Sequence, residues 1–91
     1  MDLRSLPGHE LIEKGLSDLA SDRETAEAML VAIGAERLRR AGISIQLHLP
    51  PDPEHRLYAL LARNEPDSAH SRYNALIRQL VSFERAAECV A

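Results

Sequence analysis

The sequence predicts an all-α fold, a single bundle-like domain of four helices that covers residues 1–91. The first observation is an apolar seam near the C-terminus, which repeats at alternating intervals of four and three residues over three heptads. The second is that three earlier stretches carry apolar residues at helical spacing between start and stop signals. The third is that one stretch alone has the period-two pattern of a strand, so a sheet within the chain would lack a second member.

Composition allows a real but aliphatic core. Apolar residues make up 45% of the chain, yet the aromatic residues are only two tyrosines and one phenylalanine. The net charge of −3 gives no overall field that favours nucleic acid or anionic lipid. Cys89 is the single cysteine, so an intrachain disulfide is excluded and a reducing compartment is favoured. With no run of eighteen apolar residues and no signal-peptide pattern, we expect a cytoplasmic protein without a membrane segment.

The first helix is predicted at about residues 9–20, after a flexible arm at 1–7. Its apolar face consists of Ile12, Leu16 and Leu19. Gly15 interrupts this helix at a cost of about 1 kcal/mol relative to alanine. We interpret this glycine as a place where another helix approaches closely.

The second helix is predicted at 22–41, between two clear signals. Ser21 and Glu24 have the spacing of a capping box, which predicts that the helix begins directly after Ser21. At the other end, Gly42 is suited to the left-handed position of a Schellman turn, with Leu38 and Ile43 in apolar contact across it. Gly34, within this helix, is interpreted as a packing notch.

An extended segment is predicted at 43–49, where Ile43, Ile45, Leu47 and Leu49 alternate with polar residues. Because a lone strand leaves its backbone groups unpaired, three arrangements remain open. The segment is a linker laid over the helices, a ribbon paired with a second copy, or one irregular helical turn. The linker is the favoured arrangement.

The third and fourth helices are predicted at 53–64 and 67–90. Asp52 suits an N-cap and Pro53 the first helical position, while Pro66 ends the third helix near residue 64. On the fourth helix, Ile77 and Val81 lie beside the seam and widen it, which suits a helix that packs against two neighbours.

The seam of the fourth helix also predicts a homodimer. A helix of about 24 residues is about 36 Å long, whereas a compact domain of this size is about 32 Å across. The last turns of the helix should therefore lack cover in one chain. The expected interface is formed by the seam residues Tyr73, Leu76, Leu80, Phe83, Ala87 and Val90.

No pattern in the sequence predicts a catalytic, cofactor or metal site. Asp67 and His70 are one helical turn apart, but a helical metal site needs further inward ligands, so surface histidines are the favoured interpretation. The cluster Arg37, Arg39 and Arg40 could bind an anion. Complementation of the helix dipole, together with ion pairs to the acidic first third of the chain, is favoured instead.

The leading functional hypothesis is a small, non-enzymatic protein–protein interaction module that is homodimeric through its C-terminal helix. The runs at 73–78 and 81–85 resemble those of a small bacterial family, a resemblance to which no activity attaches. The alternative is a DNA-binding regulator of the ribbon-helix-helix type, in which Ser44, Gln46 and His48 would read the major groove. Residues 43–91 carry a net charge of −1, which argues against nucleic acid as a partner. A third hypothesis is an enzyme that binds a metal or a small ligand at Asp67 and His70.

Overall fold

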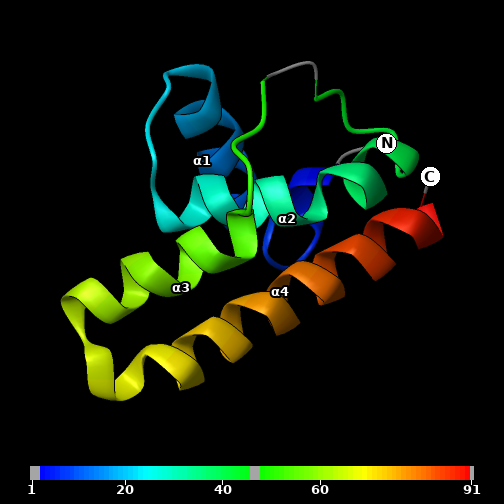
Figure 1. Ribbon diagram of the computed structural model, residues 1–91. Helices are drawn as coiled ribbons and strands as arrows, with labels where there is room; N and C mark the ends of the chain where they lie inside the picture. Colours follow the sequence, from blue (N-terminus) through cyan, green and yellow to red (C-terminus); the bar gives the residue numbers. More distant parts are fainter. Residues whose placement is uncertain (1–2, 46–47, 91) are drawn as a thin grey trace.

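The computed structural model describes residues 3–45 and 48–90, and this part of the chain is all-α (Figure 1). Its four α-helices confirm the predicted fold class. Two short 3-10 helices precede α1 and α4. The elements in chain order are η1 (Leu3–Ser5), α1 (His9–Ala20), α2 (Ala26–Arg40), α3 (Pro53–Asn64), η2 (Pro66–Ser68) and α4 (Ala69–Val90).

The second helix is the centre of the domain. α2 contacts α1, α3 and α4, while α3 and α4 form an antiparallel hairpin beside it (Figure 1). A helix with neighbours on several sides needs apolar residues around most of its circumference, which is what this sequence provides. The buried residues of α2 are Ala28, Met29, Leu30, Val31, Ala32, Gly34, Ala35 and Leu38.

Two glycines allow the helices to approach closely, as the sequence predicts. A Cβ atom on Gly15 of α1 would lie 2.4 Å from the carbonyl oxygen of Glu27 and 2.4 Å from Cγ2 of Val31, both on α2. On α2, a Cβ atom at Gly34 would lie 2.7 Å from Oε2 of Glu84 on α4. The α1–α2 and α2–α4 contacts therefore both depend on a missing side chain.

The predicted start of the second helix is wrong by four residues. α2 begins at Ala26 with Thr25 as its N-cap, and the hydroxyl oxygen of Thr25 accepts a hydrogen bond from the amide of Ala28 at 3.2 Å. Ser21 instead follows the last turn of α1, where its amide donates to the carbonyl of Ser17, and Asp22 has a φ of 57°. The residues between Ser21 and Thr25 form the turn between the two helices, so the capping box does not form.

The predicted stop of α2 is confirmed. Gly42 has a φ of 99°, its amide donates to the carbonyl of Arg39, and the amide of Ile43 donates to the carbonyl of Leu38. These two bonds are those of a Schellman turn. Leu38 is buried, and Ile43 packs against the core beside it.

The segment at 43–49 is described at residues 43–45 and 48–49, and neither part contains a strand. Ile45 is only 4% exposed, and its carbonyl oxygen accepts a hydrogen bond of 2.9 Å from Nε of Arg39. Ser44 and His48 are exposed. This is the geometry of a linker laid over the helices, while the predicted positions 46 and 47 lie outside the described residues.

The third helix has the predicted bounds, with Pro53 in its first turn. Asp52 occupies the N-cap with a left-handed φ of 49° but makes no side-chain cap hydrogen bond. After Glu65 the chain forms η2 and enters α4, which begins two residues later than expected. The described part of the predicted arm has a defined course, because residues 3–5 form η1 and Leu6 packs against the core.

The domain is elongated along α4. Its principal extents are 39, 25 and 17 Å, and a helix of the length of α4 measures about 33 Å. The length of the fourth helix is therefore close to the longest dimension of the protein. Within the described ranges, no helix is both long enough and apolar enough to cross a membrane.

Candidate interaction surface

The seam of α4 is largely covered within one chain. Leu80, Phe83 and Ala87 are 3%, 1% and 0% exposed. Gly8 lies against the side of α4 at Phe83, because a Cβ atom on Gly8 would be 3.7 Å from the Cβ of Phe83. The expectation that Phe83 and Ala87 lack cover in a monomer is therefore wrong. The elongated shape of the domain is the reason, since the expectation assumed a sphere.

The outer positions of the seam remain partly accessible. Tyr73, Leu76 and Val90 are half-buried. Of the six residues predicted to form an interface, these three can contact another molecule without opening the core. The interface of the predicted homodimer is thus reduced to the two ends of the seam, on either side of the buried turns.

A second apolar surface runs along the side of the same helix. Tyr73, Ile77 and Val81 are spaced four residues apart, are all half-buried, and form one ridge. At one end of the ridge, the ring of Tyr73 packs on that of Tyr58 of α3, with 5.8 Å between the ring centroids. Tyr58 is 40% exposed and is the one large apolar residue among the described residues that is classed as exposed. We call these four residues the outer strip.

Only α4 borders the outer strip at its C-terminal end. A hollow of about 410 Å³ is lined there by Ile77, Arg78, Val81, Ser82 and Arg85, all of them from α4. Val81 also lies outside the core cluster, whereas Ile77 packs against it. Val81 is therefore a half-buried apolar side chain that does not pack against the core cluster.

Two arginines flank this end of the strip without a partner. Arg78 and Arg85 are exposed, and neither forms an ion pair or a side-chain hydrogen bond with any residue that the structure describes. Most other cations of the chain differ in this respect. Arg56 pairs with Glu24, for example, and Arg72 with Glu65 at 3.8 Å.

The predicted arginine cluster is divided among three partners. Arg37 lies 3.5 Å from Glu84 of α4, and Arg40 lies 4.0 Å from Glu36 one turn earlier. Arg39 donates to the carbonyl of Ile45. Each guanidinium group is directed to a different place, so these residues do not form one convergent anion site.

The acidic network around Asp18 joins α1 to α2. Asp18 is 3% exposed, and its carboxylate accepts hydrogen bonds from Nζ of Lys14 at 2.7 Å and from the hydroxyl of Thr25 at 2.6 Å. These hydrogen bonds, that from Lys14 first, lower the pKa of Asp18 below its ordinary value. Since Arg23 and Thr25 lie at the turn and Lys14 lies one turn earlier on α1, we assign this carboxylate to the stability of the end of α1 and the α1–α2 turn.

Glu84 is the second buried acid. It is 3% exposed and fills the space that the missing side chain of Gly34 leaves. Burial raises the pKa of Glu84, and the nearby Arg37 partly offsets that effect. A lone buried carboxylate can act as an acid or base, but chemistry also needs a substrate cavity. Glu84 does not line any of four hollows that border the described residues.

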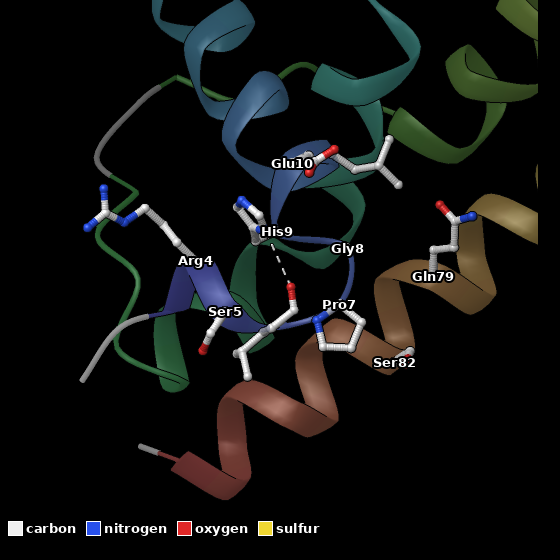
Figure 2. Close-up of a pocket in the computed structure, with 10 residues that line it drawn as sticks. Arg4, Ser5, Pro7, Gly8, His9, Glu10, Gln79 and Ser82 are labelled. Carbon is white, nitrogen blue, oxygen red and sulfur yellow. Dashed lines mark hydrogen bonds between the residues drawn. The ribbon is translucent and has the colours of Figure 1, made fainter.

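A hollow of about 790 Å³ lies at the start of α1 (Figure 2). Its walls are the turn from η1 to α1 on one side and Gln79 and Ser82 of α4 on the other. His9 directs Nδ1 to the carbonyl oxygen of Leu6 at 3.3 Å, so its ring is fixed to the turn on which it lies.

The sequence offers Asp67 and His70 as candidate metal ligands. Nε2 of His70 is 3.2 Å from Nδ2 of Asn74, so its hydrogen-bond partner is a neighbour on the same helix. Among the residues that the structure describes, no three histidine, cysteine or acidic side chains are grouped closely enough to hold a metal ion. Cys89 is exposed.

The sequence alone does not reveal the combination of Val81 with Arg78 and Arg85. The sequence alone places Ile77 and Val81 beside the seam. That the two arginines have no ion-pair partner among the described residues can be recognised only from the folded structure. Comparison with known proteins adds no assignment: no protein-family model, no curated protein and no solved structure matches this chain.

Proposed function

We propose that this protein is a small, non-enzymatic interaction module that binds other proteins through α4. The proposal is carried by one observation, the outer strip of apolar residues that stays accessible after the core has closed. Exposed apolar residues are common singly, but a contiguous row rimmed by charges is typical of an interaction site. The proposal keeps the cytoplasmic location that the sequence predicts.

The first partner to consider is a second copy, as the seam predicts. The half-buried positions Tyr73, Leu76 and Val90 support a homodimer through α4, because contact would cover them further. The buried state of Leu80, Phe83 and Ala87 in one chain supports it less, because these residues have no apolar area left to lose. Sedimentation at micromolar concentration measures this directly, and a species of 10.1 kDa throughout would remove the homodimer.

The module itself is tested by selection of binding peptides from a random library displayed on phage. We expect the wild-type protein to enrich peptides that no longer bind a Val81→Asp variant. Val81 is half-buried but lies outside the core cluster, so this change should lower the unfolding temperature far less than the same change at the buried Leu80.

The matched control is Ser71→Asp, which adds the same charge at an exposed position about 15 Å from Val81 along α4, before the first residue of the ridge. The enriched peptides should bind this variant as they bind the wild type. Enrichment of no peptides, or of peptides that bind Val81→Asp equally well, would contradict the proposed function.

A further inference from the structure

We infer that the partner of the outer strip is an acidic, amphipathic helical segment of another protein. This inference rests on the proposed function and names the chemistry of its partner. The inferred partner depends on the charged residues around Val81, whereas the proposed function rests on the apolar residues alone.

The local charge of this surface differs in sign from the net charge of the chain. The chain carries a net charge of −3, yet the exposed charged residues of α4 after position 75 are Arg78, Arg85 and Glu88. The one other acid in this part of the helix, Glu84, is buried and faces Arg37. An acidic protein thus presents a locally basic surface, at the turns where apolar side chains are only half-buried.

Both arginines of this surface are available to bind a partner. Neither Arg78 nor Arg85 has a charged partner among the residues that the structure describes. Both also line the hollow that contains Ile77 and Val81. Guanidinium groups at the rim of an apolar contact select carboxylates on the partner, because like charges there are repelled.

The spacing of the charged and apolar residues indicates the shape of the partner. Arg78 and Arg85 are seven positions apart, which is about 10 Å along a helix. Ile77 and Val81 are separated by a single turn. A helix of the partner protein matches this pattern when it carries two carboxylates about two turns apart and a pair of apolar residues between them. Amphipathic helices bind apolar surfaces of other proteins in this way.

A second copy of this chain matches the pattern poorly. A two-fold contact places the same patch on both sides. Two strips would then bring four arginines together, with Glu88 as the exposed acid from each copy. A membrane is also a poor match, since two arginines supply little attraction to anionic lipid, and stable attachment takes a larger basic cluster.

The experiment continues with the peptides that the wild-type protein enriches. We expect them to carry apolar residues at helical spacing, flanked by aspartate or glutamate, and to bind more weakly as salt is raised. Arg85→Glu should weaken binding of a synthetic copy about tenfold, measured by fluorescence anisotropy. The double variant Arg78→Glu with Arg85→Glu should instead bind a copy in which lysine replaces the acidic residues.

The matched control is Arg63→Glu. Arg63 is exposed on α3 and, like Arg85, has no ion-pair partner among the described residues, so its reversal changes the net charge equally without touching the strip. Binding of the acidic peptide should change less than about twofold.

Each remaining result counts against the inference in a different way. Peptides that depend on Val81 but are not acidic, or that bind Arg85→Glu unchanged, would overturn the acidic partner and leave the module intact. A wild-type dimer that Val81→Asp converts to a monomer would assign the strip to a second copy. Co-sedimentation of the wild type, but not of Arg85→Glu, with vesicles that contain phosphatidylserine would assign the strip to a membrane.

Discussion

Replacing Gly15 by alanine should destabilise the protein, although alanine is the better helix former. The added Cβ would lie 2.4 Å from the carbonyl oxygen of Glu27, whereas ordinary contacts begin at 3.4 Å. A backbone atom cannot rotate away, so α1 and α2 must separate by about 1 Å. Overpacking of this kind costs about 3 kcal/mol at the upper end of its usual range, and the gain in helix propensity offsets about 1 kcal/mol.

The expected net loss is therefore about 2 kcal/mol in the free energy of unfolding, or about 8–16 °C in Tm for a domain of this size. Thermal unfolding followed by circular dichroism measures it. Ser17→Ala is the control, since it lies on the exposed side of the same helix and should stabilise slightly. Gly34→Ala should cost less than Gly15→Ala, because its Cβ meets the movable side-chain ends of Glu84 and Leu80. A Gly15→Ala protein as stable as Ser17→Ala would refute the close approach of α1 and α2.

Three further changes test the interior. Leu80→Asp places an unpaired charge at a position only 3% exposed and should unfold the protein. Circular dichroism would show this as loss of the far-ultraviolet helical signal. An unchanged melting curve would show that α4 does not pack as described. Thr25→Ala removes the N-cap of α2 and a hydrogen bond to Asp18, and should lower the free energy of unfolding in urea by about 1–2 kcal/mol. Thr25→Ser should restore most of this loss, and equal losses in both variants would argue against the cap. Since burial raises the pKa of Glu84 above its ordinary 4.5, the folded state binds a proton more readily, and the wild type should gain stability as the pH falls from neutral toward 4.5. Glu84→Gln should lack that gain in urea titrations, and an identical pH dependence in the two proteins would exclude Glu84 as its source.

Local signals in the sequence predicted the local structure well. The stop of α2 needs only the residues from Leu38 to Ile43, and all of its hydrogen bonds form within that span. The interpretation of Gly15 and Gly34 as packing notches is confirmed for a similar reason. A glycine in a helix has an intrinsic cost, and close packing is a frequent compensation.

The start of α2 could not be predicted in the same way, because two start signals compete within five residues. Ser21 with Glu24 forms the better pattern, yet Thr25 is the cap. The hydroxyl of Thr25 also donates to Asp18, seven positions earlier and in another helix. That contact exists only once α1 and α2 meet, so it is absent from any pattern of neighbouring residues.

The burial of the seam shows a limit of arguments from length. Helix length was compared with the diameter of a sphere, but the domain is 39 Å long in one direction and 17 Å in another. The chain gains this shape because α2 crosses the hairpin of α3 and α4 and thereby covers Leu80 and Glu84. Which side of α4 is covered depends on that crossing, and heptad spacing does not encode it.

The same crossing separates residues that fold the protein from residues that are free to bind. Leu80 and Phe83 are fully used by the core, so a change there affects stability whatever the function is. Val81, Arg78 and Arg85 lie on the same helix, but they neither join the core cluster nor pair with another described residue. Folding stability therefore supplies no reason for an apolar side chain and two unpaired cations to occupy neighbouring turns. Binding does supply one, and because changes at these three positions should leave the core cluster intact, we expect them to allow function to be measured apart from stability.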